Sequence, residues 1–66
     1  MTAKNFLEYF NLLGTDIEVI EIIRDFNVEL FFNPNSLRHG KMDTFLSRCL
    51  VNSFSIKNNI LQIYIK

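Results

Sequence analysis

The last fourteen residues of the chain constrain its fold more than any other stretch, because they have the pattern of a β-hairpin. Two runs rich in β-branched residues flank Asn58-Asn59. A two-residue hairpin turn needs positive φ at both positions, which asparagine tolerates. This turn would place Ile56 opposite Leu61 and Phe54 opposite Ile63. The pattern then predicts one apolar face, with Phe54, Ile56, Leu61, Ile63 and Ile65, and one polar face, with Ser53, Ser55, Lys57 and Gln62.

The length of the chain limits it to one small domain, which we place at residues 1–66. A hydrophobic content of 48% is enough for a core, so a disordered tail is excluded. With one cysteine and one histidine, neither a disulfide nor a metal cluster is expected to support the fold, which leaves oligomerisation. The apolar runs are too short to cross a bilayer, so we expect a cytoplasmic protein without a membrane partner.

Two segments have the apolar spacing of amphipathic helices. The first helix is predicted over residues 2–13 and ends before Gly14, a residue suited to a helix C-cap. The last helix is predicted to begin near Lys41 and to end at Asn52. The expected apolar stripes are Phe6, Tyr9, Phe10 and Leu13 in the first helix, and Met42, Phe45, Leu46, Cys49 and Leu50 in the last.

The segment between Ile17 and Phe26 supports two interpretations. Its β-branched residues favour a strand, but in a strand Glu21 would share a face with apolar neighbours. At helical spacing the acidic residues line up on one side, and residues 15–18 have the spacing of a capping box. These patterns predict a further helix here, the second in chain order. Its acidic stripe would consist of Glu18, Glu21 and Asp25.

Residues 27–32 alternate as a strand does, and the turn cluster that begins at Asn33-Pro34 ends it. The inner face of this strand would carry Val28, Leu30 and Phe32. The predicted fold is therefore α+β, in the order ααβαββ, with a three-stranded sheet whose C-terminal antiparallel hairpin packs on the helices. The side-chain pattern permits strand 27–32 to pair in parallel with residues 53–57 or antiparallel with residues 60–66.

The charges are segregated along the chain. Residues 1–33 hold two basic and six acidic side chains, a net charge of −4, and residues 34–66 hold five basic and one acidic, a net charge of +4. We expect the two halves to neutralise each other within the fold. The alternative is an anion or nucleic-acid partner for the basic half. Its candidate residues are Arg38, His39, Lys41, Arg48 and Lys57, with Lys66 at the C-terminus.

None of these charged groups forms a recognisable catalytic or metal site. The acidic stripe lacks a nearby histidine, so we interpret it as a solvated face or a contact for a basic partner. The loop Arg38-His-Gly-Lys41 precedes a predicted helix start, where an anion can bind, but it lacks P-loop spacing. Cys49 lies on an apolar stripe and is expected in the core. We therefore expect no enzyme activity, no cofactor and no metal.

The face of the sheet opposite the core is the strongest candidate for a binding surface. The predicted register places Phe31, Ile60 and Tyr64 there. Three large side chains need cover, which a helix of the same chain, a second copy or another protein can supply. The sequence leaves these three alternatives open.

These observations predict a small non-enzymatic protein-binding regulator or inhibitor that forms a homodimer. Richness in Asn, Ile, Phe and Lys is compatible with an AT-rich genome such as that of a phage, a plasmid or another mobile element. The expected location is the cytoplasm, and the host cytoplasm if the gene is carried by a phage. The alternative function is a nucleic-acid-binding regulator that uses the basic C-terminal half.

Overall fold

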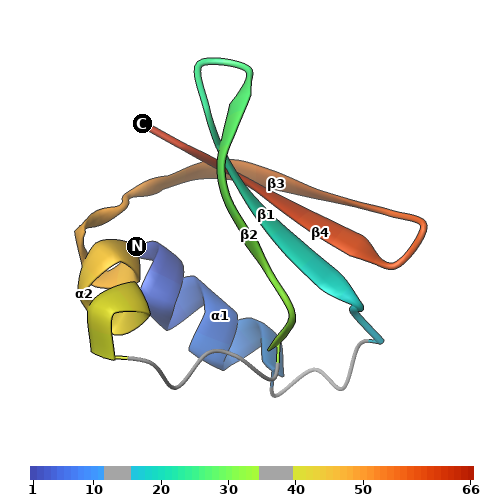
Figure 1. Ribbon diagram of the computed structural model, residues 1–66, viewed down its shortest axis with the longest axis horizontal. Coiled ribbons are helices and arrows are strands. Elements are labelled where there is room, and N and C mark those ends of the chain that lie inside the picture. The colour runs from blue at the N-terminus through green and yellow to red at the C-terminus, as the bar shows by residue number, and fades with distance from the viewer. Residues whose placement is uncertain (12–15, 35–39) are drawn as a thin grey trace.

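The computed structural model describes residues 1–11, 16–34 and 40–66, and of these it leaves out the side chains of residues 10, 11 and 40–43. The elements occur in the order αββαββ (Figure 1). Two helices and a four-stranded mixed sheet form a small α+β domain. The elements are α1 (Ala3–Asn11), β1 (Val19–Arg24), β2 (Asn27–Phe32), α2 (Gly40–Arg48), β3 (Val51–Lys57) and β4 (Ile60–Ile65).

The C-terminal hairpin forms as predicted. Asn58 and Asn59 make the turn with φ values of 52° and 65°, the positive values that a tight hairpin turn requires. Strands β3 and β4 pair antiparallel, with Ile56 opposite Leu61 and Phe54 opposite Ile63. The register read from side-chain alternation is therefore confirmed, because one shifted residue would have turned each apolar side chain to the wrong face.

The predicted second helix is wrong, because the segment from Ile17 to Phe26 contains strand β1 and the two-residue turn that follows it. Strand propensity prevails here, since five of its residues are β-branched. The proposed capping box has no helix to cap. Thr15 lies outside the described residues, and the Glu18 backbone N–H donates instead to the Asn59 carbonyl oxygen at 2.8 Å.

The sheet has the strand order β2-β1-β4-β3, with β1 and β4 parallel and both outer pairs antiparallel. The prediction of three strands is therefore wrong. Both predicted partners of strand 27–32 are also wrong, because β2 pairs with β1, which separates it from β4. The connection through α2 joins the two edge strands, β2 and β3, while β1 and β4 lie between them (Figure 1).

A bulge in β2 changes which side chains face the core. Ile22 lies opposite Leu30, but Ile23 lies opposite Val28, so Glu29 is the extra residue in β2. As a result Leu30 faces the core while Val28 shares the opposite face with Ile23. The prediction that Val28 faces inward is wrong for this reason, whereas Phe32 is buried as expected.

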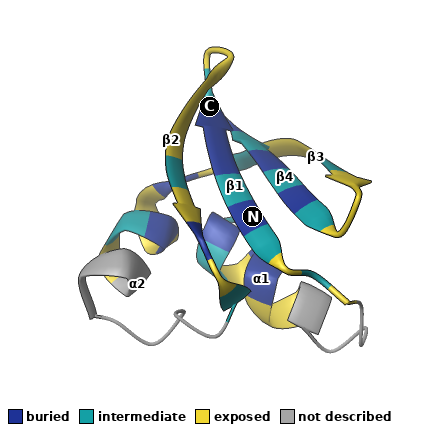
Figure 2. Cartoon of the chain, turned by 45° about the vertical axis from the view of Figure 1, so that its right-hand side comes forward, coloured by how far each residue is buried: buried dark blue, intermediate teal, exposed yellow. Residues whose placement is uncertain are grey.

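The core lies between one face of the sheet and the two helices, which cover the same face (Figures 1 and 2). The central strands β1 and β4 supply five of its eleven residues, and both strands are largely buried (Figure 2). Tyr9 is 58% exposed, so its predicted place in the apolar stripe of α1 is wrong; Ala3 and Leu7 are buried instead. The core cluster consists of Ala3, Phe6, Leu7, Ile20, Ile22, Phe32, Leu46, Cys49, Leu61, Ile63 and Ile65.

Backbone hydrogen bonds connect the start of the chain to the end of α2. The Ala3 N–H donates to the Cys49 carbonyl at 2.8 Å, and the Val51 N–H donates to the Met1 carbonyl at 2.9 Å. Thr2 caps α1, because its Oγ1 accepts from the Asn5 N–H at 3.2 Å. These bonds hold α1 beside α2 and leave both helices on the core side of the sheet.

Candidate protein-binding surface

The face of the sheet that points away from the helices is called the outer face here, and the strand registers place its residues in three rows. The middle row crosses all four strands. A row on each side of it completes the face. From β3 to β2, the middle row is Ser55, Gln62, Glu21 and Phe31; one flanking row is Lys57, Ile60 and Val19, and the other is Ser53, Tyr64, Ile23 and Val28.

The apolar side chains of the outer face gather on the side of β1 and β2. Phe31 is 72% exposed and Val28 48% exposed, and both lie on the edge strand. Ile23 is buried but is not part of the core cluster, because it lies on the outer face, between Tyr64 and Val28 in one flanking row. Within the described part of the chain, no helix or strand lies over this face (Figure 1).

The three residues that the sequence selected as a patch, Phe31, Ile60 and Tyr64, do share the outer face. They are less closely grouped than predicted, because β1 separates Phe31 from the other two. Ile60 and Tyr64 are partly exposed on β4. Neither described helix covers them, so of the three predicted kinds of cover a second copy and another protein remain as proposals.

A polar network crosses the centre of the outer face. The Gln62 amide donates from Nε2 to Glu21 Oε1 at 3.0 Å. Its Oε1 accepts from the Ser55 hydroxyl at 3.1 Å and from the Tyr64 hydroxyl at 3.2 Å. These polar groups already have partners within the chain, which lowers the cost of removing water from the face.

The β1–β2 hairpin ends in an aromatic residue that the sequence analysis did not select. Phe26 is fully exposed, and its φ is 68° beside 51° for Asp25. Positive φ at a bulky residue is unfavourable. Asp25-Phe26 lacks the asparagine or glycine that signals such a turn, and this is why the hairpin was not found in the sequence.

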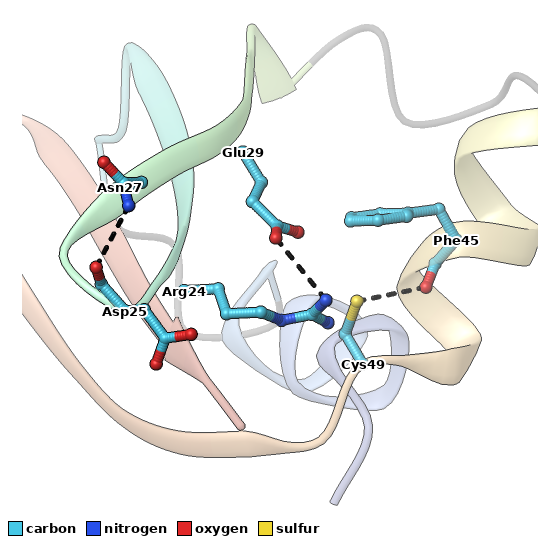
Figure 3. Close-up of polar contacts among 6 residues, drawn as sticks. All are labelled: Arg24, Asp25, Asn27, Glu29, Phe45 and Cys49. Atoms are coloured by element: carbon cyan, nitrogen blue, oxygen red, sulfur yellow. Dashed lines mark hydrogen bonds and ion pairs between the residues drawn. The ribbon is translucent and has the colours of Figure 1, made fainter.

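The acidic stripe predicted on a helix does not form, because its three residues lie along the β1–β2 hairpin. Glu18 is exposed just before β1. Glu21 lies in the middle row of the outer face, where it accepts the bond from Gln62. Asp25 is in the exposed turn, where its carbonyl accepts from the Asn27 side chain at 3.1 Å (Figure 3). Glu21 is therefore the only member of this group on the proposed surface.

The basic candidates are not brought onto one surface in the part of the chain that the structure describes. Arg38 and His39 lie outside the described residues, as does the side chain of Lys41. Arg48 is exposed at the end of α2, on the helix side of the sheet. Lys57 is exposed at the end of β3, on the outer face. The structure thus gives no observation that favours a nucleic-acid surface over a protein surface.

A second polar cluster lies on the helix side of the sheet, below β2 (Figure 3). Arg24 Nη1 lies 3.4 Å from Glu29 Oε1. Cys49 is buried beside this pair, and its thiol donates to the Phe45 carbonyl oxygen at 3.2 Å. Burial raises the pKa of the Cys49 thiol, while the positive charge of Arg24 lowers it by a smaller amount. A protonated, buried thiol is a poor nucleophile.

Other kinds of site have little support in the described residues. No group of three or more histidine, cysteine, aspartate or glutamate side chains there could hold a metal ion. Among the described helices, none has the length and hydropathy needed to cross a membrane. The outer face is therefore our candidate site.

Sequence reasoning missed three members of this surface, Val19, Ile23 and Val28. The signal was present, since Val19, Glu21 and Ile23 alternate at the spacing of a strand. The carboxylate at the centre of that alternation argues against a strand when only the local pattern is considered. It is instead the polar centre of a half-exposed face, held by Gln62.

Comparisons of the chain with protein-family models, with curated proteins and with solved structures found no match.

Proposed function

We propose that this protein is a small non-enzymatic protein-binding module that regulates or inhibits another protein, and that the outer face is where a protein docks. The observation that supports the proposal is the uncovered sheet. Both helices pack on one face, while the other presents Phe31, Val28 and Tyr64 without a described element over them. Several large apolar side chains left uncovered on one face are a feature of interaction surfaces.

The composition of the outer face resembles that of a protein interface more than that of a catalytic site. Aromatic side chains lie beside a central polar network, and Lys57 lies at the margin. Stable interfaces combine aromatic anchors with polar groups whose hydrogen bonds are satisfied. Glu21 near the middle of the face disfavours a nucleic-acid ligand, because its charge would repel phosphate groups.

The test compares the wild-type chain with Phe31→Lys. Lysine is preferred to glutamate because Glu21 lies directly opposite Phe31 in the neighbouring strand. Tagged chains are used as bait for untagged copies of the same chain and for proteins in a lysate of the native host. We expect Phe31→Lys to weaken retention of the bound polypeptide at least about tenfold, since an exposed aromatic side chain that the partner buries is worth more than about 1.4 kcal/mol.

The matched control is Tyr9→Lys, which introduces the same charge at an aromatic residue that is exposed on α1, on the other side of the molecule. It should retain the partner, and both variants should keep the wild-type circular dichroism spectrum. If the wild-type chain retains neither copies of itself nor any other polypeptide, the proposal is wrong. It is also wrong if Tyr9→Lys and Phe31→Lys weaken binding equally.

A further inference from the structure

We infer that the protein which docks on the outer face is a second copy of this chain, packed sheet against sheet with the two-fold axis parallel to the strands. This inference rests on the proposed function and names its partner. Its three supports are the area of the face, the arrangement of charges in its rows, and the bulges at both edges of the sheet.

The area is sufficient for a small dimer. Four strands spaced about 4.8 Å apart, each with about six residues rising about 3.3 Å, cover roughly 400 Å² in plan. The accessible area is larger, because Phe31 and Val28 project from the face. Two such faces cover about 800 Å² in plan, and their projecting side chains bring the buried accessible area close to the roughly 1,000 Å² that a specific interface needs. One face is a modest part of the 4781 Å² surface of the chain.

The rows decide how a second copy can be oriented. A two-fold axis parallel to the strands places β1 of each copy over β4 of the other and keeps each row over itself. Glu21 then lies over Gln62 of the second copy, and Val19 lies over Ile60. Likewise Ile23 lies over Tyr64. Near the axis apolar side chains meet apolar ones, and the carboxylate meets an amide that still has one N–H available to donate. At the margin of the interface Phe31 lies over Ser55 of the second copy, and Val28 lies over Ser53.

The other two-fold arrangement opposes like charges. An axis across the strands would place Glu21 over Glu21 of the second copy at the centre of the interface. Two carboxylates brought together in a dry interface repel each other, because water no longer screens them. The first arrangement avoids this contact. Packed sheets lie about 10 Å apart with their strands within about 30° of each other, so the residue pairs close to the two-fold axis still lie opposite each other.

Association through the sheet edges is the remaining rival, and both edges are irregular. Strand β2 contains the bulge at Glu29, whose charged side chain turns inward to Arg24. Strand β3 has a second bulge between Val51 and Ser53 and ends in Lys57. Bulges and inward-pointing charges are the features by which natural sheets avoid edge-to-edge pairing. Face-to-face packing is therefore the favoured mode of self-association.

The first experiment is sedimentation equilibrium of the full chain from about 1 to 100 µM. We expect a species of twice the 7.8 kDa chain mass, and Phe31→Lys should raise the dimer dissociation constant at least about tenfold. Tyr9→Lys should leave the constant unchanged. A wild-type chain that is monomeric over this range overturns the inference. The proposed function still stands if that monomer retains a host protein and Phe31→Lys releases it.

The second experiment tests the orientation by cross-linking with a bismaleimide that has a short spacer. A mixture of Ser55→Cys chains and Phe31→Cys chains should give a cross-linked heterodimer, because these positions oppose each other in the inferred dimer. Ser55→Cys alone should not cross-link, and the wild type serves as the control for buried Cys49. Cross-linking of Ser55→Cys alone would overturn the inference, since it indicates an axis across the strands or pairing through β3.

Discussion

At the scale of single residues, the two tight turns of the sheet have the same backbone but very different side chains. The pair Asn58-Asn59 and the pair Asp25-Phe26 both have positive φ at each position. Asparagine tolerates this conformation, whereas a bulky residue such as Phe26 loses roughly 1–2 kcal/mol in the left-handed region. The exposed ring of Phe26 makes up none of that loss by burial.

We therefore predict that Phe26→Gly stabilises the protein. Relief of the unfavourable φ outweighs the entropy that glycine adds to the unfolded chain, for a net gain of about 0.5–1 kcal/mol. The melting temperature should rise by a few degrees, measured by circular dichroism at a fixed protein concentration. Asn59→Gly is the control and should change stability by less than about 0.5 kcal/mol. A loss of stability in Phe26→Gly would show that the ring makes a stabilising contact.

At the scale of elements, the sequence predicted the segments whose local signals agree with one another. In residues 53–66 the turn residues, the β-branched content and the alternation all indicate one hairpin. In residues 17–26 the signals conflict, because Glu21 interrupts an otherwise apolar strand. Its place is explained only by Gln62, which lies 41 residues further along the chain and binds it across the parallel strand pair. A long-range contact of this kind has no local signature.

The parallel pairing of β1 with β4 should depend on Gln62 for this reason. Gln62→Leu removes its bonds to Glu21, Ser55 and Tyr64 and leaves Glu21 without its amide donor. We predict a loss of about 1–2 kcal/mol in the free energy of unfolding by urea. Ser55→Ala removes only one of the bonds and should cost about 0.5–1 kcal/mol. Equal losses in the two variants would mean that the bond between Gln62 and Glu21 adds nothing to stability.

At the scale of the whole molecule, the candidate surface was only partly predictable. Period-two alternation was enough to place Phe31, Ile60 and Tyr64 on a common face. Their separation by β1 was not predictable without the fourth strand. Whether a helix covers the face depends on how both helices pack, and each amphipathic pattern shows only which side of its own helix is apolar. The uncovered face is therefore a result of tertiary packing.

The uncovered outer face and the two edge strands also affect the solubility of the protein. A chain with an apolar sheet face and two edge strands is at risk of extending its sheet without limit. Strand β2 is the more exposed edge in this respect, since Phe26, Val28 and Phe31 are all exposed along its hairpin. Glu29 interrupts this edge, because it occupies the bulge and turns toward Arg24.

We predict that Glu29→Val converts closed association into open-ended association. Valine favours a regular strand and removes the inward charge that opposes pairing at β2. The direct cost in stability should be at most about 1 kcal/mol, because the lost ion pair with Arg24 is partly exposed. Sedimentation velocity should reveal species larger than a dimer that grow with concentration, accompanied by thioflavin fluorescence. Glu8→Val removes the same charge from the exposed side of α1 and should remain unaggregated. If both variants aggregate to the same extent, net charge and not the β2 edge controls solubility.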